Sequence, residues 1–285
     1  MTPDELGALR ALNDVEHRRF VQIPGYRTES AAMSTRCLSL SGQAYVFWQA
    51  ATDDLCSLVE AEIAWHRHRA RRLTWKVYEH DSTPATEAAL RAYGFACEGP
   101  PNRCAGLQLN NQHINVCLRR GYTCSRLNRA AELDELISLY DQIWPNEDNG
   151  LWLSGYRDAL ACGDDGLHLM VIRDENRQVV ASGGLIHTAN QAIGHLFGGG
   201  TLSSHRQQGL YKYLVALRAE LLWRRGGRWL VVDAGEESWP ILQATGGWRT
   251  FRHRQTGVGQ REQKLAIRNL VIAWHGVTSC MQTHR

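Results

Sequence analysis

The chain repeats one order of secondary structure in its two halves, and this recurrence restricts the fold more than any other feature. In the first half, the spacing of apolar residues predicts a helix, a strand, a helix and a closing glycine–aromatic pair, at residues 55–68, 73–78, 84–93 and 94–95. In the second half the same four parts fall at residues 210–225, 228–234, 237–245 and 247–248. Each half also places a leucine, Leu90 or Leu242, four residues before a closing glycine. The recurrence predicts an α/β protein with a duplicated unit.

Two tandem domains follow from this recurrence, with their boundary in the polar segment 110–123. We place the domains at residues 1–118 and 119–285, and two unrelated α/β pieces are the alternative. After the second copy, residues 259–276 show the helical spacing of apolar side chains again. We expect this helical tail to pack on the body of the protein or on a partner subunit, which leaves a homodimer open. A helix on a membrane surface is the less favoured interpretation.

Composition and charge exclude several classes of protein. Hydrophobic residues make up 44% of the 285, which is enough for a globular core. The net charge of +3 gives no reason to expect a nucleic acid or a membrane as a partner, and we interpret the basic cluster 66–72 as solvated surface. No apolar stretch approaches the roughly 20 residues of a membrane span, and the N-terminal segment lacks the apolar core of a signal peptide. The eight cysteines form no C-x-x-C pair, which favours reduced thiols, no metal site and a cytoplasmic location.

The two halves differ in the turn before the long helix. Asp53 and Asp54 of the first half stand where the second half has Arg206 and Gly209. The glycine lets the backbone approach a ligand closely, and the start of a helix presents N–H groups and partial positive charge, whereas two carboxylates repel a phosphate. We therefore predict an anion site in the second half only, with Lys212 in reach of a further phosphate.

The helix after this turn is predicted to pack through an apolar stripe. The stripe consists of Leu210, Tyr213, Leu214, Leu217 and Leu221. The same spacing puts Lys212 opposite the stripe and Arg218 at its edge. A seat for the phosphate of a different nucleotide is the weaker interpretation, because the chain lacks the G-x-x-x-x-G-K-[ST] and G-x-G-x-x-G motifs.

Residues Arg206 to Tyr211 resemble the loop pattern of the GNAT superfamily of acetyl-CoA-dependent N-acetyltransferases, Arg/Gln-x-x-Gly-x-Gly/Ala, which follows a strand and opens a helix. Tyr211 departs from the pattern, which has a small residue there. The order of strand 192–202, loop, helix, strand and short helix also resembles the superfamily, and the first half is similar to the degenerate copy of its tandem members. The resemblance implies two tandem domains, each a mixed and mostly antiparallel sheet flanked by helices, open between its fourth and fifth strands.

The same resemblance implies acetyl-CoA as cosubstrate and no metal. It places Gly200 and Thr201, with Gly199, beside the thioester, and it implies that the backbone around Leu202 pairs with the pantetheine arm. The implied pyrophosphate seat consists of Arg206, Gln207, Gln208, Gly209, Leu210, Tyr211 and Lys212. Taken alone, the triple glycine 198–200 is also typical of a bulge or a tight bend in a strand.

An amine that attacks the thioester directly must lose a proton, and a base is needed for this step. Many members of the superfamily use a glutamate on the fourth strand, where this chain has His195 and no carboxylate. His195 is therefore the first candidate base, although a histidine of the core or surface is the alternative. Asp233, Glu236 or Glu237 are candidates that act through water, and the two glutamates also fit a role as charges at a helix N-terminus.

The thiolate of CoA must gain a proton, and many members use a tyrosine four residues before the closing glycine. Leu242 or Gln243 occupies that place here. Ser238, Tyr211 or a water molecule is the predicted substitute, unless the thiolate needs no strong acid. For Tyr211, a place in the helix core is an equal alternative.

The resemblance places the acceptor-binding loop and helix at residues 143–160. Glu147 and Asp148 are predicted to attract an ammonium group, and Trp152 and Tyr156, with Trp144, to wall the pocket, although both tryptophans also fit a packing role. We expect a small-molecule primary amine as acceptor rather than a protein or peptide. A GNAT-fold protein that senses CoA or an amine without turnover is the non-enzymatic alternative.

Overall fold

The computed structural model describes residues 2–97, 102–110 and 116–259. The helices are α1 Pro3–Asp14, a π-helical turn Val15–Arg19, α2 Leu55–His66, α3 Pro84–Ala92, a 3-10 turn Ala130–Glu132, α4 Leu133–Ile143, α5 Asn149–Ala161, a 3-10 turn Ser203–His205, α6 Leu210–Arg224 and α7 Trp239–Thr245. The strands are β1 Tyr26–Ser30, β2 Ser34–Ser39, β3 Gln43–Gln49, β4 Arg72–Tyr78, β5 Ala96–Cys97, β6 Asn102–Gln108, β7 Thr123–Leu127, β8 Leu167–Arg173, β9 Val179–Ile186, β10 Ile193–Thr201, β11 Trp229–Ala234 and β12 Arg249–Gly259. The predicted tail helix lies, apart from Gly259, outside the described residues.

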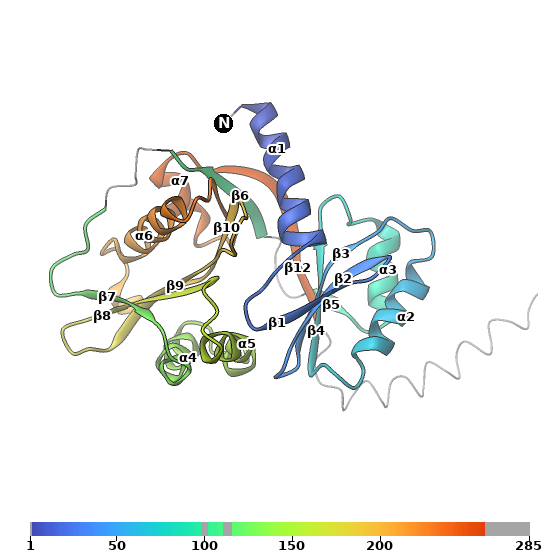
Figure 1. The fold of residues 1–285 in the computed structure, drawn as a ribbon, viewed down its shortest axis with the longest axis horizontal. Coiled ribbons are helices and arrows are strands. Elements are labelled where there is room, and N and C mark those ends of the chain that lie inside the picture. The colour runs from blue at the N-terminus through green and yellow to red at the C-terminus, as the bar shows by residue number, and fades with distance from the viewer. Residues whose placement is uncertain (1, 98–101, 111–115, 260–285) are drawn as a thin grey trace, which may run out of the picture.

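The recurrence predicted from the sequence is confirmed in the structure. We call β1–β4 with α2 and α3 the first unit, and β7–β11 with α4–α7 the second unit (Figure 1). In the first unit α2 joins the parallel pair β3 and β4, and in the second α6 joins the parallel pair β10 and β11. Leu90 and Leu242 are buried, each in the core of its own unit. The α/β tandem architecture was thus correctly predicted.

Strands are exchanged between the units, so that the described strands form one continuous sheet. Its order is β1-β2-β3-β4-β12-β6-β11-β10-β9-β8-β7, with β5 beside β12. β6, which follows the first unit in the chain, pairs antiparallel with β11 of the second unit, and β12 crosses from α7 to pair with β4 (Figure 1). The predicted domain boundary after residue 118 stays a prediction, and the hydrogen bonding of β6 crosses it.

Helix α6 covers one face of the second unit, and α4 and α5 cover the other. The spacing correctly predicted Leu210 and Leu214 as core, but it placed Arg218 at the edge of the stripe, and this was wrong. Arg218 is 1% exposed and points at the sheet. Its guanidinium fits there because Gly183 has no side chain: a Cβ on Gly183 would lie 2.6 Å from Cζ of Arg218. Arg218 donates hydrogen bonds to the backbone oxygens of Leu214 and Gly184.

The predicted basic surface over residues 66–72 is only partly correct. Arg67, His68, Arg69 and Arg71 are exposed, but His66 is buried. Its side chain lies 3.7 Å from the buried carboxylate of Glu62. Burial lowers the pKa of His66 to about 4, so this histidine belongs to the core of the first unit.

Candidate active site

The parallel pair β10–β11 separates part-way along its length. Pairing runs from Ile193 and Trp229 to Leu196 and Val232 and ends there. Beyond that point β10 continues along β9 as far as Thr201, while β11 continues along β6. The two strands therefore open at their carboxyl ends, which is where open α/β sheets bind ligands.

A bulge in β10 accompanies the opening. The register of β10 against β9 shifts between Phe197 and Gly200, and Gly198 has a φ of +56°. The hydroxyl of Tyr140 donates a hydrogen bond of 2.8 Å to the backbone oxygen of Gly198, and Ser182 donates another of 3.2 Å. A bulge bends its strand, so the interpretation of the triple glycine as a bulge is confirmed.

The loop between β10 and α6 turns backbone N–H groups outward. Gln207 and Gly209 have φ values of +61° and +79°, and α6 begins directly after Gly209. From Gln207 to Lys212, the amides have no hydrogen-bond acceptor among the residues that the structure describes. Free amides at the start of a helix form a seat for an anion.

Charged and hydroxyl side chains surround this seat. Arg206 is 53% exposed, donates to the backbone oxygen of Thr201 at 3.4 Å and lies 3.6 Å from the carboxylate of Glu237. The ring of Tyr211, at the position where a small residue was expected, lies against Gly199, and its hydroxyl lies near that of Ser238, which donates to the backbone oxygen of Gly235 at 3.2 Å. Burial raises the pKa of Tyr211. The two candidate acids predicted from the sequence are thus brought together.

His195 and Asp233 lie on one face of the sheet next to the opening. His195 pairs with Val231 in the strand register, and Asp233 follows two residues later on the same face. Nε2 of His195 is 3.9 Å from Oδ2 of Asp233, and the Cys104 thiol donates a 3.1 Å hydrogen bond to Oδ1. Glu236 is exposed, as is Glu237, which faces Arg206 instead.

No protein-family model and no curated protein matches this sequence. Solved structures do match it. A GCN5-related N-acetyltransferase from Kribbella flavida superposes with a TM-score of 0.56 at 14% identity, over 92% of this chain and 96% of that one. A tandem GNAT protein from the clavulanic acid biosynthesis pathway superposes with a TM-score of 0.55 at 16% identity, over 91% of this chain and 95% of that one. This chain has a tandem GNAT fold.

The predicted acceptor residues lie on α5 of the second GNAT unit, or directly before this helix. Asp148 caps α5, because its side chain accepts the N–H of Leu151 at 2.8 Å. Glu147 is more than half exposed and lies 3.8 Å from Arg72 of the first unit. Trp152 and Tyr156 pack against Phe197, two residues after the candidate base.

The first GNAT unit forms part of the surroundings of this site. Tyr26 lies beside Tyr156, with ring centroids 6.2 Å apart, and Gly25 contacts the backbone of Gly155 in α5. Among the described residues, no group of three His, Cys, Asp or Glu side chains is placed to hold a metal ion. Within the same residues, none of the helices has both the length and the apolar character needed to span a bilayer.

Sequence reasoning missed His17, a residue of the π-helical turn that follows α1. Its ring lies 5.4 Å from the ring of His195, measured between centroids. The charged run from Glu16 to Arg19 was the only signal in the sequence, and no spacing rule connects it with a strand far along the chain.

Proposed function

We propose that this chain is an acetyl-CoA-dependent N-acetyltransferase, in which the second unit binds the cosubstrate and transfers the acetyl group to a primary amine. One observation carries the proposal: a row of unpaired amides, from Gln207 to Lys212, lies next to the opening between β10 and β11. Acetyl-CoA would place its diphosphate on those amides and its acyl-bearing arm in the opening between the strands.

Several features of the described residues fit such a ligand. The side-chain oxygen of Thr201 is buried and has no hydrogen-bond partner among the described residues, so a polar group of a ligand would satisfy it. The backbone of Leu202 is already paired on both sides, because its N–H donates to Val180 and its oxygen accepts the N–H of His205, each at 2.9 Å. Arg206 and Lys212 supply positive charge beside the amides.

The residues at the opening fit proton transfer. Acetyl-CoA supplies the acetyl group as a reactive thioester. His195 takes a proton from the ammonium group of the acceptor, and the neighbouring carboxylate of Asp233 favours the protonated imidazole that results. Tyr211 and Ser238 lie near each other on the α6 side and supply the proton for the departing thiolate.

A small amine fits the acceptor side. The aromatic side chains of Trp152, Tyr156 and Phe197 line the approach to His195 from α5, and aromatic faces attract a cation. Glu147 is exposed near Arg72 and attracts an ammonium group from solvent. A sensor that binds CoA without turnover is the second candidate, because the glutamate and tyrosine common in the superfamily are absent.

Thiol release from acetyl-CoA, measured against a panel of small amines, tests the reaction. We expect thiol release that depends on the amine. Saturable CoA binding without amine-dependent thiol release would instead support the sensor.

Charge reversal at Arg206 tests the location of the cosubstrate. A hydrogen bond to a charged group contributes about 1.5–3 kcal/mol, so Arg206→Glu should weaken CoA binding by roughly tenfold to a hundredfold. Asp53→Ala is the matched control, since Asp53 is exposed at the corresponding turn of the first unit, whereas Asp54 caps α2. Isothermal titration calorimetry with CoA measures both variants. Equal losses in the two variants would contradict a site restricted to the second unit.

A further inference from the structure

Tyr211 stands where the phosphate-loop pattern has a small residue, and its side chain lies at the opening between β10 and β11. A Cβ on Gly199 would be 2.9 Å from Cε2 of Tyr211, so the ring lies directly against the backbone of β10 at its bulge. The hydroxyl of Tyr211 lies near Ser238, in the segment between β11 and α7. The ring therefore extends from one side of the opening toward the other.

This ring lies on the face of the sheet that α6 covers. Leu196 and Val232 form the last pair of β10 and β11 before the opening, and they belong to an apolar core that includes residues of α6. Tyr211 packs against the same core. Because side chains alternate along a strand, His195 and Asp233 lie on the opposite face. The opening thus has Tyr211 on one face and the candidate base on the other.

The opening is closed toward the beginning of β10. Leu196 pairs with Val232 there, and the two carboxylate oxygens of Glu16 accept the N–H groups of Ala192 and Ile193, at 3.1 and 3.0 Å. Glu16 belongs to the π-helical turn after α1, so the N-terminal segment holds the start of this strand. An acyl group in the opening can therefore extend only toward one face of the sheet or the other.

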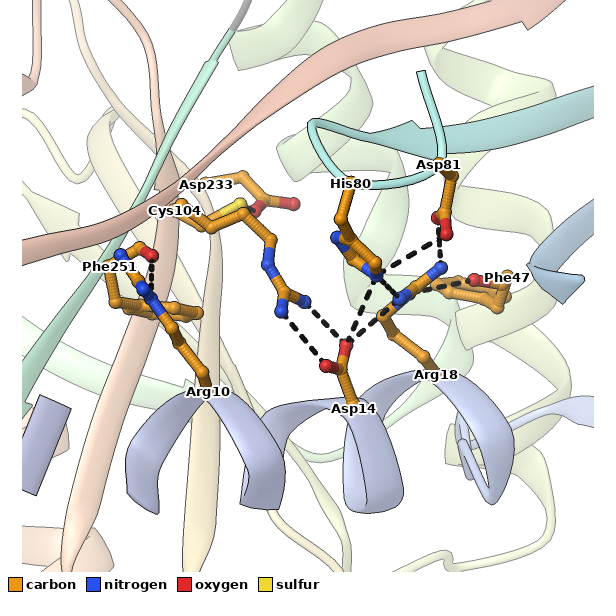
Figure 2. A network of polar contacts seen from close by, with 10 residues as sticks. Arg10, Asp14, Arg18, Phe47, His80, Asp81, Cys104, Asp233 and Phe251 are labelled. Carbon is orange, nitrogen blue, oxygen red and sulfur yellow. Dashed lines mark hydrogen bonds and ion pairs between the residues drawn. The ribbon is translucent and has the colours of Figure 1, made fainter. Parts of the chain in front are cut away.

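The face with His195 is charged (Figure 2). The thiol of Cys104 donates a hydrogen bond of 3.1 Å to Asp233. Next to this pair lies a connected set of ionised side chains from the N-terminal segment, β12 and the end of β4: Asp14, Arg18, Arg252 and Asp81. An alkyl chain gains free energy when it is buried among apolar groups, not among charged ones. The acceptor amine also needs this face, because it must reach His195.

We propose that the ring of Tyr211 restricts the acyl donor to acetyl-CoA by closing the α6 side of the opening to longer acyl chains. The proposal rests on the proposed function and deepens it, since it names the class of donor. With the acceptor on the face of His195, the alkyl end of a longer acyl group would have to extend toward α6, where the ring lies. A small residue at position 211 would leave this space open.

The size of the expected discrimination follows from the number of methylene groups. Propionyl-CoA has one methylene more than acetyl-CoA, and butyryl-CoA has two. One methylene in an apolar pocket changes kcat/KM by about 10- to 200-fold, and extra methylenes in a well-packed region force strained side chains. Removal of the ring frees more volume than two methylenes occupy. The preference for the acetyl group should therefore depend on the ring and not on the hydroxyl.

Three variants separate the size of the side chain from its other roles. Tyr211→Ala removes the ring, and Tyr211→Phe removes only the hydroxyl. Tyr213→Ala is the matched control, because Tyr213 is also a tyrosine of α6 but packs against the other core of the second unit. Loss of the candidate proton donor should lower kcat for every donor in both Tyr211 variants. The ratio of kcat/KM between donors cancels this shared loss.

The measurement is kcat/KM with acetyl-, propionyl- and butyryl-CoA against one amine. We expect the wild type to lose about tenfold or more for each added methylene. Tyr211→Ala should bring the three donors within about threefold of one another, while Tyr211→Phe and Tyr213→Ala should keep the ratios of the wild type. Unchanged ratios in Tyr211→Ala, or an equal change in Tyr211→Phe, would overturn the proposal.

Binding provides a test that needs no turnover. By isothermal titration calorimetry, the wild type should bind butyryl-CoA about tenfold or more weakly than acetyl-CoA, and Tyr211→Ala should bind the two about equally. Equal affinities in the wild type overturn the size limit, whether or not any variant folds. Discrimination in binding without thiol release from any amine refutes the proposed transfer reaction instead, so the two failures are distinguishable.

Discussion

Replacing Asp14 with asparagine should destabilise the protein because two guanidinium groups lose a shared carboxylate. Asp14 is 32% exposed, but its partners Arg18 and Arg252 are only 2% and 10% exposed. Breaking one side of a buried pair costs about 3–5 kcal/mol. Since Asp14 keeps some solvent and Arg18 keeps Asp81, we expect a loss of about 2–3 kcal/mol, or about 4–10 °C in Tm.

The effect of the substitution should depend on pH. Burial opposes the charge of Asp14, but hydrogen bonds from Arg252 and Arg18 outweigh it and hold the pKa of this carboxyl below its ordinary value. A carboxyl whose pKa is lower in the folded state adds stability above about pH 4, and this stability is lost as the pH falls through the folded value. The difference in stability between the wild type and Asp14→Asn should therefore be constant near neutral pH and shrink below about pH 4.

Urea unfolding followed by tryptophan fluorescence, at several pH values, measures this difference. Glu220→Gln is the control, because it removes an exposed ion pair with Arg224 on α6 and should cost about 0.3–0.5 kcal/mol. Adding Arg252→Met to Asp14→Asn should restore part of the stability, since it removes an uncompensated buried charge. A loss in Asp14→Asn no larger than that of the control, or a loss that does not change with pH, would refute this reasoning.

Two further outcomes can be measured by the same urea unfolding. Gly183→Ala should destabilise the protein by about 1–3 kcal/mol, because its Cβ would meet the guanidinium of Arg218. Gly7→Ala, which has open space in α1, should stabilise it by about 0.5–1 kcal/mol. Similar effects at the two sites would count against the close packing of Arg218. Burial lowers the pKa of His168 to about 3, so the unfolded chain binds its proton first, and this site removes stability as the pH falls below about 6.5. His168→Leu should therefore lose less stability than the wild type between pH 7 and pH 5, and parallel pH curves would contradict this.

Periodicity in the sequence was sufficient for the helices and strands of the repeated unit, but it carries no information on strand partners. β6 and β12 are each recognisable as strands, yet no local pattern says that β6 pairs with β11 and that β12 pairs with β4. The same limit applied to Arg218. A helical wheel places its side chain at the edge of the apolar stripe, and only the absence of a side chain on Gly183, in another strand, explains how a guanidinium is accommodated in the core.

In the candidate site, too, local sequence patterns predicted some residues, and tertiary packing brings in the others. The phosphate loop is a contiguous segment whose glycine and helix start act locally, so the sequence was enough to predict where free amides would lie. His195 and Asp233 stand on adjacent strands that a single helix connects, so their proximity could also be expected from the sequence. His17 contacts them only because α1 crosses β12, and a contact between elements so far apart in the chain depends on tertiary packing that no sequence pattern encodes.

The residues before 118 have a role that the absence of a phosphate loop from the first unit does not suggest. If residues after 118 were expressed alone, β11 would lose β6 and present an unpaired edge beside the proposed site. The same cut would remove Glu16 from the start of β10 and His17 from the face of His195. Asp53 and Asp54 predict that the first unit binds no phosphate, but the residues before 118 supply a strand, a clamp on β10 and a neighbouring imidazole to the second unit. A half of the chain that is not expected to bind the cosubstrate can therefore be retained because the second unit is incomplete without it.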